Sequence, residues 1–171
     1  MSMILLGIPL GIILPYILSY NDILLGIDAV NYYGEVHTSY LNSMVHTIFM
    51  PFTVYGILLW IPKVFNLNIR NAVNFQKLAY VTYMTHYIIL DYKIGLLTTL
   101  YYYLPLYYAN QKYLIDYNKY VPIKGFCISF ISLTIQEIFG HWLGGDDPSR
   151  VEAIPNAILY SMYYSVWHLF A

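Results

Sequence analysis

The sequence predicts an all-α protein, a polytopic transmembrane bundle of five to six hydrophobic helices that forms a single membrane domain over residues 1–171. Composition is the first reason: 59% of the residues are hydrophobic and only 10% are charged, whereas soluble domains are about 45–50% apolar and about 25% charged. The second reason is that the apolar residues form separate runs near the ~20 residues that a helix needs to cross a bilayer. A formal net charge of −1 without a basic run argues against nucleic acid as a partner.

The first half of the chain contains two of these runs. Residues 3–20 carry no charge and lack the positive n-region of a signal peptide, so we expect a retained hydrophobic helix within residues 1–20. Pro9 and Pro15 are expected to kink this helix, and an interfacial or re-entrant helix is the alternative. After an acidic stretch, residues 43–61 form a clear candidate for a membrane span.

Four further apolar runs follow, at residues 78–90, 94–108, 125–143 and 154–170. The first two are short for full spans, and the polar turn between them predicts a helical hairpin. The polar loops at 62–77 and 110–124 each carry three Lys or Arg residues, whereas the stretch 21–40 and the turn 144–148 are acidic. The positive-inside rule therefore predicts that the two basic loops are cytoplasmic and that the acidic segments lie on the opposite side.

A polar cluster stands at the start of the run 43–61. His37 and His46 are nine residues apart, roughly 900° around a straight helix, which would put them on opposite faces. They can share a ligand only if the helix breaks between them. Thr38, Ser39 and Asn42 favour such a break, because short polar side chains compete for backbone groups. We therefore predict Asn42 as the helix N-cap and His46 in the first turn. The alternative is two interfacial histidines that hydrogen-bond to the backbone.

A second polar cluster, with Glu137 and His141, closes the run 125–143. Because residues four apart share a helical face, an α-helix would bring these two side chains together. A carboxylate within an apolar run indicates function by default, although a Glu–His hydrogen bond that only orients the helix end is the alternative. Threading the runs back and forth brings this cluster to the side of His37 and His46, which predicts a shared metal ion.

The remaining chemistry-bearing residues are interpreted more simply. Asp146 and Asp147 are expected to be solvated turn residues, and His86 and His168 to be packing histidines. His86 approaches the side of the cluster, whereas His168 is expected about 14 residues of helix away, or about 21 Å. The single cysteine, Cys127, excludes an intrachain disulfide and a multi-cysteine metal site. Two classes without a metal centre stay open: a small transporter or channel with a histidine proton relay, and a scaffold without chemistry.

The order of the polar residues resembles a known family. His37, Asn42 and the stretch 46–51 follow the pattern H-x4-N-x3-H-x-I-F-x-P, which resembles the opening motif of the fungal 2-hydroxy fatty acid dioxygenases. Weaker matches lie at residues 32–33, 90–97, 114–116, 140–141 and 155–156. The resemblance covers residues 30–171, and the first 20 residues have no clear counterpart. Glu137 stands where the family usually has Gln.

The resemblance implies a membrane enzyme of the endoplasmic reticulum. It would use Fe(II) and O₂ to shorten a long-chain 2-hydroxy fatty acid by one carbon, as in phytosphingosine breakdown, with the acyl tail between apolar helices. It implies His37, His46 and His141 as iron ligands, in keeping with the preference of non-haem iron for imidazole and carboxylate. Asn42 would orient a ligand or the substrate carboxylate, and Glu137 would be either a ligand or the partner of His141. The fourth ligand stays open among Glu137, His86, His168, Asp146 and Asp147.

Overall fold

The computed structural model describes residues 3–19, 26–35, 37–147 and 154–170. Within these ranges every regular element is helical, which confirms the predicted all-α class. In chain order the elements are η1 (Met3–Leu6), α1 (Gly7–Ser19), α2 (Gly26–Glu35), α3 (Tyr40–Val64), α4 (Ile69–Leu90), α5 (Tyr92–Ile115), α6 (Val121–Ile135), η2 (Gln136–Trp142) and α7 (Ile154–Trp167). The element η2 is a π-helix that continues α6.

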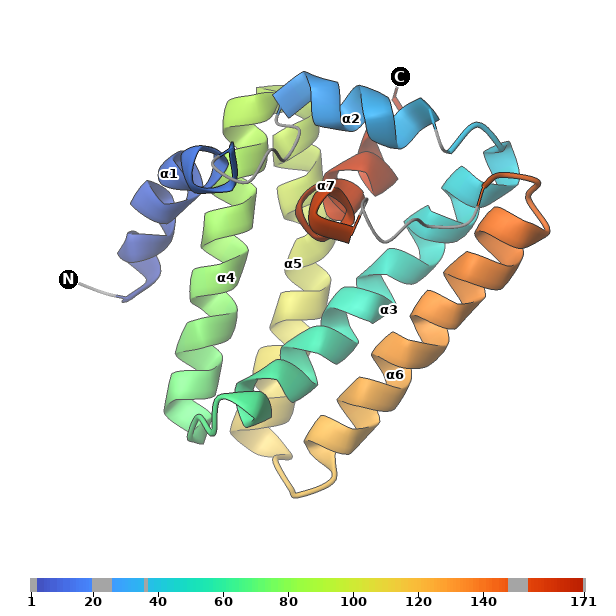
Figure 1. The fold of residues 1–171 in the computed structure, drawn as a ribbon. Coiled ribbons are helices and arrows are strands. Elements are labelled where there is room, and N and C mark those ends of the chain that lie inside the picture. Colours follow the sequence, from blue (N-terminus) through green and yellow to red (C-terminus); the bar gives the residue numbers. More distant parts are fainter. Residues whose placement is uncertain (1–2, 20–25, 36, 148–153, 171) are drawn as a thin grey trace.

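Two pairs of long helices form the body of the molecule (Figure 1). α3 and α6 run side by side, and α4 and α5 form an antiparallel hairpin. The two short helices α2 and α7 lie at the upper end of the bundle, where α7 contacts α2, α3 and α5. α1 packs along α4. The start of α3, the π-helix η2 and α7 therefore come together at one end of the bundle.

The close contact between α3 and α6 depends on two glycines. A Cβ atom built on Gly56 would lie 2.5 Å from the carbonyl oxygen of Gly125, and one built on Gly125 would lie 2.4 Å from Leu59 Cβ. A larger residue at either position would therefore force the two helices apart. A hydroxyl group also joins them, because Ser132 Oγ donates to the carbonyl oxygen of Phe49 at 2.6 Å. Small residues and short polar side chains are typical of helix pairs in membranes.

Donors on neighbouring helices satisfy the carbonyls that the prolines of α3 leave free. Pro51 has no N–H, so the carbonyl of Thr47, four residues earlier, lacks its usual helical donor. The hydroxyl of Tyr101 on α5 donates to that oxygen at 2.8 Å. Four residues before the second proline, the carbonyl oxygen of Leu58 accepts from Gln76 Nε2 on α4 at 2.7 Å. These donors let α3 continue through both prolines without leaving unpaired backbone groups.

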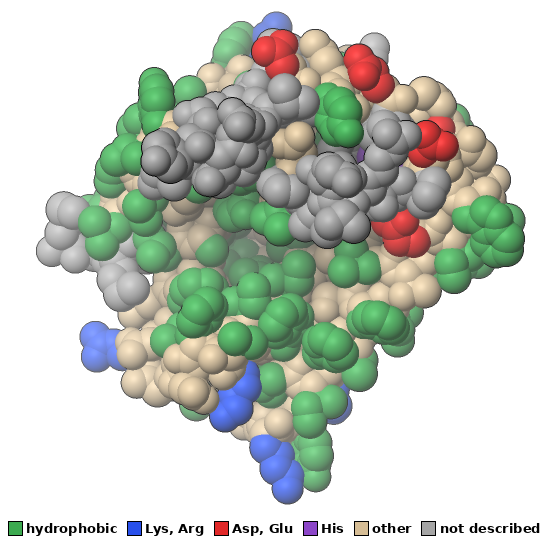
Figure 2. Space-filling model, in the orientation of Figure 1, with side chains coloured by type: hydrophobic (Ala, Val, Ile, Leu, Met, Phe, Trp, Pro, Cys, Tyr) green, Lys and Arg blue, Asp and Glu red, His purple; other side chains and the backbone are tan. Residues whose placement is uncertain are grey.

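Among the described residues, two elements are long and apolar enough to cross a membrane: Tyr40–Val64, and Val121–Trp142, which joins α6 and η2. α4 and α5 have 22 and 24 residues but do not meet the same test, and α1 has only 13. The predicted number of five to six spanning helices is therefore not confirmed. Figure 2 shows basic side chains mainly at the lower end and acidic ones at the upper end, with hydrophobic side chains between them.

Several segments predicted as loops are helical. α4 and α5 extend into the polar stretches 62–77 and 110–124, and the acidic stretch 21–40 contains α2. Asn68 explains the early start of α4, because its side chain accepts a hydrogen bond from a backbone N–H of the first turn at 2.9 Å. The predicted helical hairpin is confirmed: Asp91 separates α4 from α5 and its carboxylate accepts from the first N–H groups of α5.

Candidate metal centre

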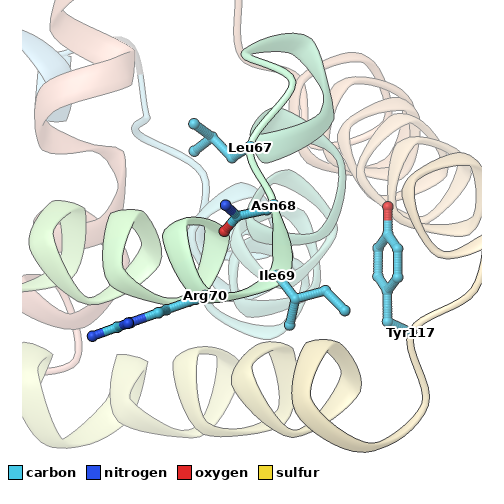
Figure 3. Close-up of a pocket in the computed structure, with 5 residues that line it drawn as sticks. All are labelled: Leu67, Asn68, Ile69, Arg70 and Tyr117. Carbon is cyan, nitrogen blue, oxygen red and sulfur yellow. The ribbon is translucent and has the colours of Figure 1, made fainter.

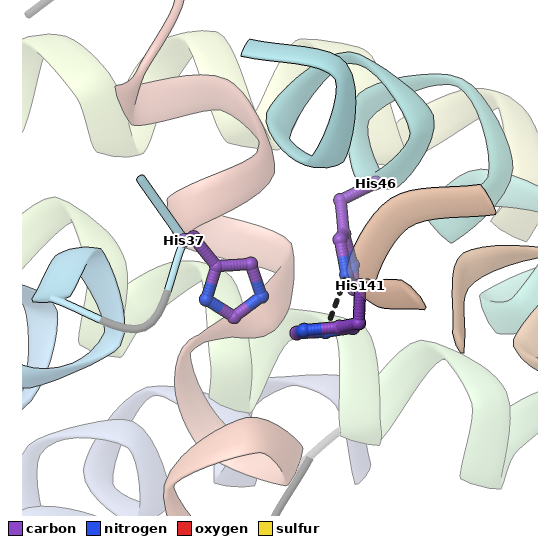
Figure 4. A group of neighbouring side chains, drawn as sticks. All are labelled: His37, His46 and His141. Carbon is purple, nitrogen blue, oxygen red and sulfur yellow. Dashed lines mark hydrogen bonds between the residues drawn. The ribbon is translucent and has the colours of Figure 1, made fainter. Parts of the chain in front are cut away.

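Three histidines from three separate segments meet at the upper end of the bundle. His37 lies in the non-helical linker before α3, His46 in the second turn of α3, and His141 in η2. All three are at most 6% exposed, and nitrogen atoms that can bind a metal lie within 4.8 Å of one another. Figure 4 shows the rings gathered around a common space. The predicted helix break between His37 and His46, and the predicted meeting of the two polar clusters, are both confirmed.

The nitrogens of His46 and His141 have a spacing that suits coordination. Their Nε2 atoms lie 3.3 Å apart. His141 Nδ1 lies 2.7 Å from the backbone carbonyl oxygen of Asp147, which can only accept, so Nδ1 carries the proton and Nε2 holds a lone pair. Two nitrogens bound to one metal at about 2.1 Å would lie about 3.0–3.4 Å apart at ordinary coordination angles. The observed spacing therefore fits two imidazoles that share a metal ion.

Gln136 is a buried neighbour of His46 that sequence reasoning missed. Its side chain is 1% exposed and interacts with His46. The amide orientation is set by Gln136 Nε2, which donates to Thr53 Oγ1 at 2.8 Å and to the carbonyl oxygen of Ser132 at 3.1 Å. The remaining amide oxygen is an acceptor for a proton on His46 Nδ1, which would leave Nε2 free for a metal. The available signal was the glutamine that the resembling family usually has one position later, at Glu137.

The π-helical geometry of η2 determines which of its residues face the histidines. In a π-helix the backbone hydrogen bonds join residues five apart instead of four. Gln136, Gly140 and His141 are buried, whereas Glu137 is only half-buried. Glu137 lies outside the group of metal-binding side chains found among the described residues, and its pairing with His141 stays a prediction. Its catalytic role stays a prediction.

Asn42 lies beside His141 and does not cap the helix. The N-cap of α3 is Ser39, so the predicted cap is wrong by three residues and His46 falls one turn later than expected. Asn42 is fully buried, and its Nδ2 lies 3.4 Å from His141 Nδ1. A Cβ atom on Gly140 would lie 2.6 Å from Asn42 Oδ1, so this close approach requires glycine. Asn42 Oδ1 itself is buried and makes no hydrogen bond with the described residues.

Asp146 has a role that the sequence analysis did not assign to it. Contrary to the prediction of a solvated turn residue, it is partly buried and accepts several hydrogen bonds. Its Oδ1 accepts from Thr38 Oγ1 at 2.6 Å, and its Oδ2 accepts from the Ser39 N–H at 3.0 Å and from Asn42 Nδ2 at 2.8 Å. Partial burial raises the pKa of Asp146, but these hydrogen bonds outweigh that effect and hold the pKa below its ordinary value of 3.8. The acidic turn after His141 was the only available signal.

Tyr164 of α7 packs against His37, in the linker before α3. Its ring centroid lies 5.3 Å from that of His37 and 5.7 Å from that of His168. The Tyr164 hydroxyl donates to the backbone carbonyl oxygen of His37 at 3.3 Å. α7 therefore helps to hold the segment that carries the first histidine.

The other two histidines lie outside the group of metal-binding side chains. His86 packs against the ring of Tyr160, as predicted for a packing histidine. His168 lies much closer to the cluster than the predicted distance of about 21 Å. Its Nε2 is 3.1 Å from Oγ1 of Thr47, the residue that follows His46. The prediction is wrong because α7 is a short helix at the upper end of the bundle and does not run its length.

Two surface hollows lie apart from the histidine cluster. One, of about 500 Å³, lies at the lower end and is lined by Leu67, Asn68, Ile69, Arg70 and Tyr117 (Figure 3). The Arg70 side chain extends away from the other four residues in that view. The other hollow, of about 380 Å³, is apolar and lies between α5 and the end of α7. Neither is lined by a side chain of the histidine cluster.

No protein-family model, curated protein or solved structure matches this chain. The chemistry of the centre is therefore judged from its donors, which are three imidazoles and no carboxylate among the described residues. Imidazole nitrogens suit iron, zinc, copper and nickel. The three buried histidines are thus close enough to bind a metal ion and chemically suited to do so.

Proposed function

We propose that this chain is an Fe(II)-dependent dioxygenase of the endoplasmic-reticulum membrane that shortens a long-chain 2-hydroxy fatty acid by one carbon. The observation that carries the proposal is the buried cluster of His37, His46 and His141. These are the three ligands that the resemblance implies. The cluster lies at the polar end of an apolar bundle, where a fatty acid in a membrane would present its carboxylate.

The charge of the centre favours an anionic substrate. Three neutral imidazoles leave both positive charges of Fe(II) uncompensated, and the nearby Asp146 directs its oxygens to Thr38, Ser39 and Asn42. Three protein ligands also leave coordination positions open for other groups. A 2-hydroxy carboxylate can occupy two such positions through its hydroxyl and carboxylate oxygens, and it brings a negative charge. Bound iron would supply the activation of O₂.

The proposed reaction balances with O₂ as the only oxidant. The acid R–CH(OH)–COOH and one O₂ give R–COOH, CO₂ and H₂O. The bond between the hydroxyl carbon and the carboxyl carbon breaks, and the four electrons that the substrate loses reduce O₂. The reaction therefore needs no organic cofactor and no external reductant.

The surrounding residues would hold the ligands and the substrate. The Asp147 carbonyl and the Gln136 amide would orient His141 and His46. The buried Oδ1 of Asn42 is an acceptor for the substrate hydroxyl group. The apolar surface of the bundle suits the acyl tail, because large side chains such as Leu100 are exposed there.

Metal analysis of the detergent-purified protein tests the proposal first. His37→Ala, His46→Ala and His141→Ala should each abolish iron binding and turnover, whereas His86→Ala, the matched control in the packed core, should have a milder effect. Iron-loaded protein should then convert 2-hydroxy fatty acids to the acids one carbon shorter when O₂ is added, as read by mass spectrometry. Iron-loaded protein that leaves these acids intact at several chain lengths would contradict the dioxygenase function, even if the metal centre is real.

A further inference from the structure

A single carboxylate connects the segments that carry the three histidines. Asp146 lies in the turn after η2, and its carboxylate reaches the linker and the first turn of α3. It accepts from the Thr38 hydroxyl at 2.6 Å, from the Thr38 and Ser39 N–H groups, and from Asn42 Nδ2 at 2.8 Å. Its own backbone N–H donates to the carbonyl oxygen of His141 at 3.1 Å.

These partners are immediate neighbours of the proposed metal ligands. Thr38 follows His37 directly, and Asn42 precedes His46 by one helical turn. His141 is tied to the same turn twice, through the backbone of Asp146 and through the carbonyl of Asp147. A shift of this turn would therefore move all three imidazoles relative to one another.

The contacts also exclude Asp146 as a ligand in this arrangement. Both carboxylate oxygens already accept hydrogen bonds from backbone N–H groups, and each accepts one from a side chain. Gly145, the preceding residue, has φ +83°, a left-handed conformation that glycine adopts without strain and that directs the carboxylate towards α3. An oxygen that turned towards the metal would leave the N–H groups at the start of α3 unsatisfied.

We propose that Asp146 is a positioning residue of the metal centre, which holds the His37 linker, the His46 helix and the His141 turn in register for metal binding. This inference rests on the proposed metal-dependent function. Residues behind the ligands of a metal site typically contribute 10–100-fold to metal affinity. Asp146 would act in this way on all three ligands at once.

The test uses Co²⁺ as the probe in detergent-purified protein, because its visible absorption reports both affinity and coordination geometry. Asp146→Asn keeps the shape of the side chain but places an N–H₂ group against Asn42 Nδ2 or against the N–H groups of the linker. It should weaken Co²⁺ binding about 10–100-fold and leave the shape of the saturated spectrum unchanged. Asp116→Asn, the matched control, removes only an exposed ion pair with Lys112 at the end of α5 and should bind Co²⁺ within about twofold of the wild type.

Further variants separate positioning from folding. Thr38→Val removes one hydrogen bond and should weaken Co²⁺ binding in the same direction by a smaller factor, which keeps the test open if Asp146→Asn does not fold. Melting of the metal-free proteins shows whether only stability has changed. If folded Asp146→Asn and Thr38→Val both bind Co²⁺ with wild-type affinity, the positioning role is wrong but the metal centre still stands. If the saturated Co²⁺ spectrum of Asp146→Asn differs from that of the wild type, Asp146 is itself a ligand. Wild-type protein that binds no Co²⁺ would overturn the inference and the metal centre together.

Discussion

The two helices that build the centre, α3 and α6 with its continuation η2, are constructed differently in the middle and at the upper end. In the middle, Gly56 and Gly125 bring the backbones into contact. The short polar side chains there bond across the interface, as when Thr53 Oγ1 donates to Ser132 Oγ at 3.0 Å. At the upper end, buried polar atoms make no hydrogen bond of normal geometry with the described residues: Asn42 Oδ1, His46 Nδ1 and Gln136 Oε1.

This difference indicates which part of the helix pair stabilises the fold and which part is available to bind a ligand. A buried polar atom without a partner lowers stability by about 1–3 kcal/mol, so folded proteins keep few of them. Beside the histidines Asn42 Oδ1 is such an atom and is available to a ligand, whereas His46 Nδ1 and Gln136 Oε1 belong to two side chains that interact with each other. The middle holds the helices together, and its loss should unfold the protein. The upper end carries three histidines that are close enough to bind a metal ion, and their loss should leave the fold in place.

The largest expected effect comes from breaking the middle. In Gly125→Leu the new side chain begins 2.4 Å from Leu59 Cβ, so α6 must move away from α3. We expect a loss of about 3 kcal/mol of stability, measured by thermal melting in detergent. Cys127→Leu on the exposed side of the same helix is the control and should melt like the wild type. A Gly125→Leu protein with wild-type melting would show that the helix contact is not close.

A smaller effect is expected from breaking the upper end. In Gly140→Ala the new Cβ would lie 2.6 Å from Asn42 Oδ1. The Asn42 amide must move, so we expect about tenfold weaker Co²⁺ binding with little change in melting. Gly34→Ala is the control, because its Cβ would make only an ordinary contact of 3.7 Å with the Tyr164 ring. Lower melting with unchanged Co²⁺ affinity would show that this end also serves stability.

The sequence was enough to predict the all-helical class and the meeting of the histidines. Apolar runs of helical length predict the all-α class, and alternate threading brings residues at the start of one run to the end of another. The polar residues between His37 and His46 predict the helix break, because Thr38 and Ser39 favour non-helical backbone. These conclusions depend on local patterns, which a single sequence displays.

The details of the centre depend on contacts that no local pattern displays. The carboxylate of Asp146 accepts a hydrogen bond from the N–H of Ser39 at the start of α3, although the two residues are 107 positions apart in the chain. The π-helix places Gln136 on the same buried face as Gly140 and His141, through backbone bonds that side-chain spacing does not reveal. The position of α7 follows from its packing against α2, α3 and α5. Long-range capping, helix irregularity and the path of a short helix are tertiary properties.

The smallest effect is expected at the boundary between the two regions, for His168→Ala. His168 lies next to the centre, but its Nδ1 is 3.0 Å from the Tyr164 carbonyl oxygen and its Nε2 is 3.1 Å from Thr47 Oγ1. Both ring nitrogens thus have partners, and neither belongs to the group of metal-binding atoms. Removing the ring should reduce stability by about 1 kcal/mol through the lost hydrogen bonds and leave iron content near that of the wild type. His141→Ala, measured in parallel, should lose the metal. A His168→Ala protein that purifies without iron would make His168 a fourth ligand and would extend the centre to α7.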